Sequence, residues 1–517
     1  MRKISFDTQE SLWDVSATRD LEDAARGSLP PHELMSRAGT AIARLTDALA
    51  PHAQTLWIAC GPGNNGGDGL TAATLLHNHD QERGSKRRIC LTLSGDPDNL
   101  PPDASNALQN ALNSGLTLSN QPPDQYDFAL DALLGIGASR TPEGKLAQTV
   151  SRLRSSHSPV LAVDVPSGLM ADTGVLLGAA APAAAPRYTL SLLTLKPGLF
   201  TAHGRDSAGE IWFDDLGVGK DSSRPPTALL YVPTPDVAQM ARPHISHKGT
   251  FGDVLVIGGQ GAGANGVAMC GAAVLAARAA VRSGAGRVYL SLLEGGLPGD
   301  FFDPQQPEIM FRTVAAAHRD KLMGRSAVVC GCGGGDAVTA ELPAVLSDAQ
   351  TLVLDADALN AISADARLQA RLTDRQAGSA TTVITPHPLE AARLLGCSTE
   401  QIMRDRVLAS TELSQRFGVI CVLKGSGTVV TAPGKRPSIN ASGNAALATA
   451  GTGDVLAGML GAALAQCSSG QDAHLATLNG VFEHGHLADK WIRANGSRPL
   501  TADWLTRQGE LTSLAHG

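Results

Sequence analysis

The sequence has few aromatic residues, no excess of positive charge and no long apolar run. Aromatic residues make up 4% of the chain, and 42 lysines and arginines stand against 49 aspartates and glutamates, for a net charge of −7. This balance argues against nucleic acid or an acidic membrane surface as the main partner. Arg278 and Arg282 interrupt the longest alanine-rich segment, so we predict no membrane span.

Cysteine motifs and a signal peptide are also missing from the sequence. The eight cysteines include no C-x-x-C pair of the kind found in zinc and redox sites. Cys330 and Cys332 alternate along a strand-like run and are interpreted as small buried residues. The amino-terminal segment MRKISFDTQESLWD turns polar and acidic where a signal peptide has an apolar core. We therefore expect a reduced, cytoplasmic protein.

Glycine is abundant, with 56 residues in a chain of 517. Domains usually hold ~100 to 200 residues, so this length predicts two to four folding units. Abundant glycine and alanine with few aromatics favour an α/β enzyme with close helix–sheet packing. Five prolines mark a linker or crossing strand within residues 216–243. We place the boundary near 221–227, which gives domains 1–224 and 225–517.

The first half predicts a parallel sheet with polar loops at one edge. Helices are expected over 16–27 and 31–49, and strands over 55–60, 128–134 and 160–163. Each strand runs into a loop that carries glycine and polar side chains. In an open α/β sheet such loops meet at the carboxyl ends of the strands and form the ligand site.

The loop G-P-G-N-N-G-G-D-G at 61–69 is the most distinctive of these. Asn64 and Asn65 offer amide donors and carbonyl acceptors, which suit a ribose, an amide or a hard cation better than phosphate alone. The alternative is a cluster of turn-forming residues between a strand and a helix.

The second half repeats the arrangement. A helix is expected over 269–283, and the predicted strands are 253–257, 327–330, 351–354, 382–384 and 419–423. The loops that follow the last four strands read G-C-G-G-G at 331–335, D-A-D-A-L-N at 355–360, T-P-H-P-L-E at 385–390 and K-G-S-G-T at 424–428. Asp355 and Asp357 are predicted to alternate along a strand end, so at most one can face a shared pocket.

Three residues of this half are candidates for chemistry. The Gly451–Gly453 turn opens a helix, and a helix start of this kind binds phosphate. Asp454 beside a phosphoryl group can take a proton from an attacking hydroxyl, or it can simply cap the helix. Lys424 lacks the spacing of a Walker motif and can meet phosphate oxygens or remain a solvated loop lysine. His387, between two prolines, is a ligand clamp or closes a turn.

The motifs G-N-N-G-G-D-G, D-A-L-L-G-I-G and D-V-P-S-G-L resemble the NAD(P)H-hydrate epimerase family over about residues 10–220. The resemblance implies a Rossmann-like fold and interconversion of the C6 epimers of hydrated NADH and NADPH. It implies a potassium ion held by Asn65, Asp131 and Ser167, and we expect Asp164 to be the acid/base. The implied substrate-binding residues are Asn64, Asn65, Gly66, Gly67, Asp68, Gly135, Ile136, Gly137, Ala138, Ser139, Arg140, Thr141 and Asp164.

The motifs T-P-H-P-x-E, K-G-S-x-T and A-T-A-G-T-G-D-V-L-A-G resemble the ADP- or ATP-dependent NAD(P)H-hydrate dehydratase family over about residues 230–510. The resemblance implies a ribokinase-like fold with ADP as co-substrate, and we expect Mg²⁺ with it. Cys332 departs from the usual G-P-G-x-G. The implied dinucleotide contacts are Ala272, Gly333, His387 and Asp454, and the implied ADP contacts are Lys424, Gly425, Ser426, Gly427, Thr428 and Gly453.

Together the two resemblances imply repair of hydrated NADH and NADPH. One half would epimerise the hydrates at C6, and the other would use ADP to dehydrate the S epimer to NAD(P)H, AMP and phosphate. The alternative is a ribokinase-like small-molecule kinase fused to a non-catalytic nucleotide-sensing module. We expect small-molecule substrates, no nucleic acid or membrane partner, and a homo-oligomer.

Overall fold

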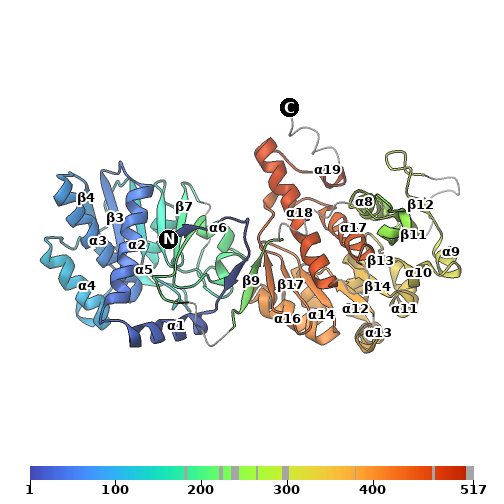
Figure 1. The fold of residues 1–517 in the computed structure, drawn as a ribbon, viewed down its shortest axis with the longest axis horizontal. Coiled ribbons are helices and arrows are strands. Elements are labelled where there is room, and N and C mark those ends of the chain that lie inside the picture. The colour runs from blue at the N-terminus through green and yellow to red at the C-terminus, as the bar shows by residue number, and fades with distance from the viewer. Residues whose placement is uncertain are drawn as a thin grey trace. The chain divides into compact units, whose positions relative to one another are not determined.

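The computed structural model describes residues 1–179, 183–219, 225–233, 244–262, 266–293, 302–378, 380–467 and 472–507. The chain divides into two compact units, Met1–Ser5 with Glu10–Leu229, and Phe6–Gln9 with Leu230–Gly517. Each unit is an α/β structure in which helices pack on a sheet (Figure 1). Part of the predicted boundary, residues 221–224, lies outside the described residues.

The sheet of the amino-terminal unit confirms the predicted parallel arrangement. All neighbouring strands are parallel except β1, which pairs with β8 in the antiparallel sense. The order of the strands is β1 (Arg2–Lys3), β8 (Glu210–Asp214), β7 (Arg187–Leu192), β6 (Val160–Val163), β5 (Phe128–Ala132), β3 (Thr55–Cys60) and β4 (Arg88–Leu93).

Both faces of this sheet are buried. Leu56, Ile58 and Cys60 of β3 pack into one core, and the alternate residues Trp57 and Ala59 pack into another. Alternation of this kind puts successive side chains on opposite faces of a strand. The predicted helices over 16–27 and 31–49 are confirmed. The helices of this unit are α1 (Val15–Ser28), α2 (Glu33–Leu49), α3 (Asn64–Arg83), α4 (Pro102–Asn113), α5 (Gly144–Arg154) and α6 (Gly204–Ala208).

The sheet of the second unit is parallel from β12 to β16 and ends in antiparallel strands. Every strand predicted for this half is present. The order runs β12 (Met310–Phe311), β11 (Arg287–Leu293), β10 (Asp253–Gln260), β13 (Ala327–Cys330), β14 (Thr351–Leu354), β15 (Thr381–Ile384), β16 (Ile420–Leu423), β17 (Val429–Thr431) and β18 (Ser438–Asn440). The chain also has the short strands β2 (Glu10–Leu12) and β9 (Ala228–Tyr231).

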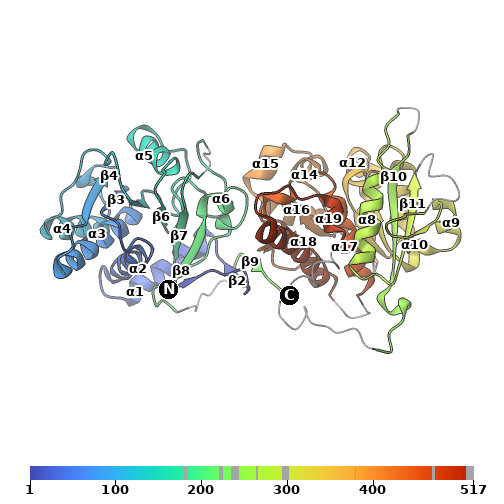
Figure 2. The same cartoon turned by 90° about the horizontal axis from the view of Figure 1, so that it is seen from above.

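Helices flank this second sheet, and α8 lies along β10 and β11 (Figure 2). The predicted small-residue helix over 269–283 is confirmed as α8. The described helices are α8 (Cys270–Arg282), α9 (Val314–Arg319), α10 (Leu322–Arg325), α11 (Val338–Asp348), α12 (Ala356–Ala364), α13 (Ala366–Asp374), α14 (Pro388–Leu395), α15 (Thr399–Arg404), α16 (Arg406–Phe417), α17 (Thr452–Ala465), α18 (Ala473–Asn495) and α19 (Ala502–Leu505).

Small residues let α17 pack directly on its neighbours. A Cβ added at Gly458 would lie 2.0 Å from the carbonyl oxygen of Ala276 in α8. A Cβ at Gly461 would lie 2.5 Å from a methyl group of Val329 in β13. Helix α17 is therefore fixed against both α8 and the sheet, and its first turn is held at the sheet edge.

Substitution Gly458→Ala should lower the free energy of unfolding of the second unit by about 1–3 kcal/mol, because the new methyl group overlaps backbone that cannot move aside. Gly271→Ala is a matched control, since a Cβ at Gly271 on α8 meets nothing within 4 Å. Urea unfolding followed by circular dichroism measures both variants. Equal stability of the two would contradict the packing described for α17.

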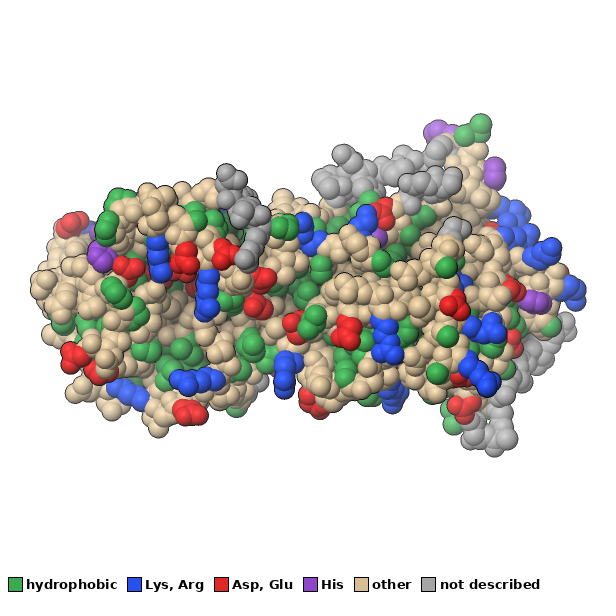
Figure 3. Space-filling view, turned by 90° about the horizontal axis from the view of Figure 1, so that it is seen from below, with side chains coloured by type: hydrophobic (Ala, Val, Ile, Leu, Met, Phe, Trp, Pro, Cys, Tyr) green, Lys and Arg blue, Asp and Glu red, His purple; other side chains and the backbone are tan. Residues whose placement is uncertain are grey.

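None of the described helices has the length and apolar character needed to cross a membrane. On the face drawn in Figure 3, acidic and basic side chains are interspersed on both units. This distribution agrees with the small net charge of the sequence.

Candidate functional site

The amino-terminal unit has a cavity of about 470 Å³ where the loops after β3, β5 and β6 meet. The sequence predicted this convergence, because these three strands are parallel neighbours. The predicted residues that line the cavity are Asn64, Asn65, Asp68, Gly135, Ile136, Gly137, Ala138 and Asp164.

Other predicted residues do not line this cavity. Gly66 and Gly67 face inward, where a Cβ would lie 2.0 Å from the Gly61 carbonyl oxygen and 2.5 Å from the Met35 methyl group, respectively. These two glycines therefore allow close packing of α3. The loop residues after Ala138 also do not line the cavity, namely Ser139, Arg140 and Thr141.

Asp164 follows β6 directly and has a φ of 66°, in the left-handed region that a non-glycine residue rarely adopts. Its carboxylate accepts a hydrogen bond from the Leu192 N–H at 3.1 Å and pairs with the ammonium group of Lys196. Lys196 is fully buried and also donates to the Leu192 carbonyl oxygen at 2.7 Å. The buried ion pair fixes the Asp164 carboxylate at the cavity wall. Lys196 was not predicted as a site residue, although it is the first residue of the segment K-P-G-L at 196–199.

Two further acids face the same cavity. Burial and the nearby charge of Asp164 raise the pKa of Asp68 well above its ordinary value, and burial raises the pKa of Glu22. The cavity therefore combines an ion-paired carboxylate with carboxyl groups that hold their protons more tightly, which is the arrangement of an acid and a base. Glu22 was missed, although Arg19, Glu22 and Arg26 recur at helical spacing along α1 and all line the cavity.

Asp131 and Ser167 lie close together beside a second cavity, of about 460 Å³. The Ser167 hydroxyl and N–H donate to the two carboxylate oxygens of Asp131 at 2.5 and 2.9 Å, and burial raises the pKa of Asp131. Asn64 Oδ1 and Asn65 Nδ2 are buried without a hydrogen-bond partner. A desolvated carboxylate and a hydroxyl oxygen are compatible with a hard cation such as potassium, which prefers oxygen ligands, whereas the orphaned Asn65 nitrogen is a hydrogen-bond donor and does not bear on a cation.

In the second unit the loops after β13, β14, β15 and β16 lie along one sheet edge, as predicted. Lys424 follows β16, and its ammonium donates to Asp355 Oδ1 at 2.7 Å and lies 3.9 Å from Glu390 Oε2. Burial opposes the charge of Lys424, but the attraction of both carboxylates outweighs it and the net pKa is raised. Lys424 is therefore an anchored cation and not a solvated loop lysine.

The prediction that Asp355 and Asp357 alternate along a strand end is wrong. Asp355 is the residue before α12, and Asp357 lies in the first turn of that helix, because the chain turns into α12 directly after β14. Asp357 accepts a hydrogen bond from the Gly335 N–H at 2.9 Å, whereas Asp355 contacts Lys424. Only one of the two carboxylates thus binds the lysine.

Asp454 lies in the first turn of α17, three residues after Gly451, whose φ is 88°. A Cβ at Gly453 would lie 3.5 Å from the Lys424 ammonium, so these two predicted ADP contacts are neighbours. Burial, with repulsion from Asp355 adding to it, raises the pKa of Asp454 to about 6. Asp454 lies inside the helix, so it is not the residue that caps it.

His387 precedes α14 and caps it. Its Nδ1 accepts hydrogen bonds from the N–H groups of Leu389 and Glu390 at 3.1 and 3.3 Å, and its own N–H donates to the Glu390 carboxylate at 2.7 Å. Burial and Lys424 lower the pKa of His387, and burial raises that of Glu390 to about 7. His387 therefore closes a turn, as one of the two predictions had it. Its imidazole ring is half-exposed and lies beside the Glu390 carboxylate.

The remaining predicted residues form two small groups. A Cβ at Gly333 would lie 2.8 Å from the Ala272 Cβ, so the two implied dinucleotide contacts are adjacent. In the loop 424–428, Gly425 has a φ of 139°, and the Thr428 hydroxyl donates to the Gly425 carbonyl oxygen at 3.1 Å. No role is predicted for the 260–266 segment, of which residues 263–265 lie outside the described residues.

Arg406 is a residue of this site that sequence reasoning missed. It is 1% exposed, and its guanidinium donates to the carbonyl oxygens of Leu423, Lys424 and Gly427 at 3.1 Å each, as well as to that of Ser426. Burial lowers its pKa to about 10. The side chain of Arg406 thus fixes the backbone of the loop 424–428. No local signal marks Arg406, because it begins a helix whose sequence is otherwise ordinary.

Known proteins are similar to this chain over almost its whole length. The family described as NAD(P)H-hydrate dehydratase matches residues 254–508, and that described as YjeF-related protein N-terminus matches residues 31–198. The bifunctional NAD(P)H-hydrate repair enzyme Nnr of Escherichia coli is 35% identical over 97% of this chain and 94% of its own length. That of Coxiella burnetii is 34% identical over 95% of this chain and 97% of its own.

A solved structure is also similar to about half of the chain. The ADP/ATP-dependent NAD(P)H-hydrate dehydratase from Bacillus subtilis, co-crystallized with ATP/Mg²⁺, is 29% identical, with a TM-score of 0.43, over 52% of this chain and 90% of its own. The full-length relatives, both family matches and the two α/β units agree with one another. The chain belongs to the family of bifunctional NAD(P)H-hydrate repair enzymes, with a Rossmann-like unit followed by a ribokinase-like unit.

Proposed function

We propose that this chain repairs hydrated NADH and NADPH at two sites, one in each unit. The first epimerises the R and S hydrates at C6, and the second dehydrates the S epimer with ADP to give NAD(P)H, AMP and phosphate. The observation that carries this proposal is that both units keep a polar site at the strand ends, in a chain that matches the repair enzymes over 97% of its length. A kinase fused to a non-catalytic sensor would not need the acids of the first cavity.

In the first unit, Asp68 and Asp164 are the proposed acid and base. The C6 carbon carries both a hydroxyl and the ring nitrogen, so the hydroxyl can leave as water once an acid protonates it. Asp68 has a raised pKa and supplies that proton. Asp164, held by Lys196, takes a proton from the water that adds to C6 on the opposite face of the ring. One water leaves and one water adds, so only the configuration at C6 changes. Asn64, Asn65, Asp68 and the loop residues 135–138, which line the cavity, bind the dinucleotide around this pair.

The proposal includes a potassium ion beside this site. Asn65, Asp131 and Ser167 would hold it, and it would supply a fixed positive charge next to the dinucleotide loop. The buried Asp131 carboxylate and the Ser167 hydroxyl supply oxygen atoms for such an ion, and Asn65 would contribute its amide oxygen.

In the second unit, Asp454 is the proposed base of a phosphoryl transfer. It takes the proton of the C6 hydroxyl as the hydroxyl oxygen bonds to the β-phosphorus of ADP, and the bond from that phosphorus to the bridging oxygen breaks to release AMP. Loss of phosphate from C6 and of a proton from C5 then restores the double bond. Lys424 and the N–H groups of Gly451 to Gly453 stabilise the transferred charge.

Other residues of this unit bind the substrates. Gly425 to Thr428 and Gly453 contact ADP, while Ala272, Gly333 and His387 contact the dinucleotide. Magnesium would enter with ADP and neutralise phosphate charge, since Mg²⁺ is usually held by one or two carboxylates and by substrate phosphates. Asp355 is a carboxylate of this kind.

One assay tests the function. The full chain is incubated with separated R and S hydrates of NADH, with and without ADP and Mg²⁺, and regenerated NADH is followed by its absorbance. We expect rapid regeneration from S with ADP, regeneration from R through epimerisation, and none without nucleotide. A phosphorylated small molecule without regenerated NADH would instead identify a kinase.

The dehydratase rate should fall as the pH drops below about 6, because the base must be ionised and the pKa of Asp454 is raised to that value. One unit below this pKa only ~10% of the carboxylate is ionised, so the rate should fall about tenfold. Single-turnover rates with saturating substrates measure the profile. A rate that does not fall until the pH reaches the ordinary pKa of an aspartate would contradict the assignment of Asp454 as the base.

Homo-oligomerisation and a cytoplasmic location also remain predictions. Analytical ultracentrifugation of the purified chain tests the first, and cell fractionation tests the second.

A further inference from the structure

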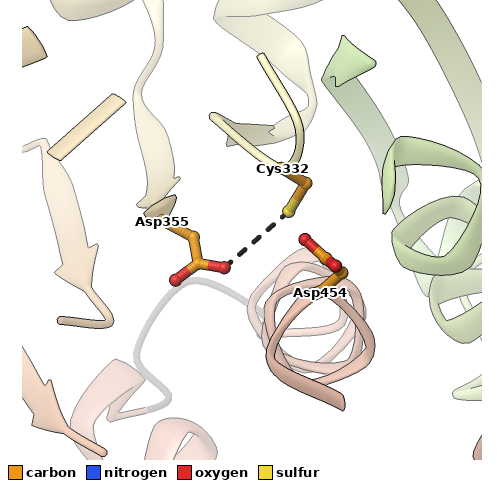
Figure 4. A group of neighbouring side chains, drawn as sticks. All are labelled: Cys332, Asp355 and Asp454. Carbon is orange, nitrogen blue, oxygen red and sulfur yellow. Dashed lines mark hydrogen bonds between the residues drawn. The ribbon is translucent and has the colours of Figure 1, made fainter. Parts of the chain in front are cut away.

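Three side chains with metal-binding atoms meet in the second unit (Figure 4). The Cys332 sulfur and carboxylate oxygens of Asp355 and Asp454 all lie within 4.8 Å of one another. They come from three separate places in the chain, the turn after β13, the residue before α12 and the first turn of α17. Cys332 and Asp355 are buried, and Asp454 is partly exposed.

The backbone holds the thiol in place. The Cys332 carbonyl oxygen accepts a hydrogen bond from the Gly259 N–H at 2.9 Å, which ties the turn to the end of β10. Gly331 and Gly333 on either side have φ values of 118° and 56°. The cysteine therefore lies in a tight turn, and its sulfur points toward the two carboxylates (Figure 4).

Asp355 is oriented by groups behind it. Its Oδ1 accepts hydrogen bonds from the Thr385 hydroxyl and the Lys424 ammonium, each at 2.7 Å. Its Oδ2 faces the Cys332 sulfur at 4.0 Å. Partners of this kind fix the direction of a metal ligand. Lys424 can remain beside the cluster, because its ammonium binds Asp355 Oδ1, whereas the Cys332 sulfur faces Asp355 Oδ2.

We propose that Cys332, Asp355 and Asp454 form a binding site for a thiophilic divalent cation such as Zn²⁺, and that the bound ion inhibits the dehydratase. Zinc has bonds of about 2.0 to 2.3 Å, so its tetrahedral ligands lie about 3.5 Å apart. Contraction of the present cluster by roughly 1 Å gives that geometry. Zn²⁺ displaces the thiol proton to solvent and forms one bond to sulfur and one to each carboxylate, and its fourth position remains open.

The sulfur ligand separates this site from the magnesium that accompanies ADP. Magnesium prefers oxygen ligands and near-octahedral geometry, whereas a thiolate favours zinc and cadmium. A bound zinc ion would occupy Asp454, so the carboxylate could no longer accept the proton of the C6 hydroxyl. The inhibitory effect rests on the role proposed for Asp454, but binding of the ion does not.

Binding is tested first, without substrates. The full chain is titrated with Cd²⁺, and the ultraviolet charge-transfer absorption of the cadmium–thiolate bond is recorded. We expect one equivalent of this signal, its loss in Cys332→Ser, and its retention in Cys397→Ser, which changes a partly buried cysteine elsewhere in the same unit. Asp454→Asn should keep the signal but weaken Cd²⁺ binding at least tenfold. Absence of the signal in the unmodified chain, or its persistence in Cys332→Ser, would overturn the proposal.

Inhibition is tested second. Each chain is assayed with ADP and excess Mg²⁺ at increasing free Zn²⁺, and its rate is divided by its own zinc-free rate. The concentration for half-inhibition should rise at least tenfold in Cys332→Ser and stay unchanged in Cys397→Ser, while epimerisation is unaffected. If Cd²⁺ binds through Cys332 but zinc leaves the dehydratase active, the inhibitory part of the proposal is wrong. If the zinc-free chain has no dehydratase activity, the proposed function fails while the binding result stands.

Discussion

Replacement of Asp454 by asparagine should lower the ADP-dependent dehydratase rate about 10²- to 10⁴-fold, the usual contribution of a general base. Asparagine keeps the shape of the side chain and cannot accept the proton of the C6 hydroxyl. The partly buried position also favours the neutral amide, so the second unit should remain folded. Regenerated NADH from the S hydrate with ADP measures the loss.

The control for this variant is Asp357→Asn. Asp357 lies in the first turn of α12 and accepts a hydrogen bond from the Gly335 N–H, which the asparagine carbonyl can still accept. Its dehydratase rate should stay close to that of the unmodified chain. Epimer exchange should be normal in both variants, because it takes place in the other unit. A dehydratase rate in Asp454→Asn equal to that of the control would remove Asp454 from the mechanism.

Asp164→Asn should have an effect of similar size on the other reaction, with epimerisation slowed about 10²- to 10⁴-fold. Asp164 is the carboxylate that the buried Lys196 holds at the wall of the first cavity. An amide there can bind the hydrate but cannot take a proton from water. Exchange between separated R and S hydrates, without ADP, measures the change, and dehydration of the S hydrate should persist.

This substitution also leaves the Lys196 ammonium buried without its carboxylate, at a cost of about 3–5 kcal/mol. The double variant Asp164→Asn with Lys196→Met removes both charges and should recover much of that stability without recovering epimerisation. An epimerase that regains activity in the double variant would show that Asp164 acts only through folding.

Much of the fold follows from local patterns. The strands at 55–60, 160–163 and 327–330 are runs of apolar residues buried on both faces, and the structure has them at those residues. Their parallel order then brings the loops together without further information. The motif at 424–428 predicted a strand-end loop and the motif at 451–454 predicted a helix start, both for phosphate, and the structure puts the Lys424 ammonium beside Gly453.

The residues that were missed act over long sequence distances. Lys196 meets Asp164 across 32 residues, and Arg406 meets the loop after β16 from the start of a helix. A lone charged residue in a sequence is usually solvated, so its burial is known only once the partner is in place. Asp357 was misplaced for a different reason, because a strand that runs directly into a helix carries no turn signal between them.

Arg406 has a consequence for how ADP binds. The loop 424–428 contains two glycines with positive φ, a segment that would otherwise sample many conformations. The buried Arg406 guanidinium donates hydrogen bonds to three carbonyl oxygens of this loop and to that of Leu423 just before it. The conformational freedom of the loop is therefore lost during folding and not on nucleotide binding. The nucleotide site is therefore preorganised, and association of ADP should carry a small entropic penalty in calorimetry and need no slow rearrangement before phosphoryl transfer.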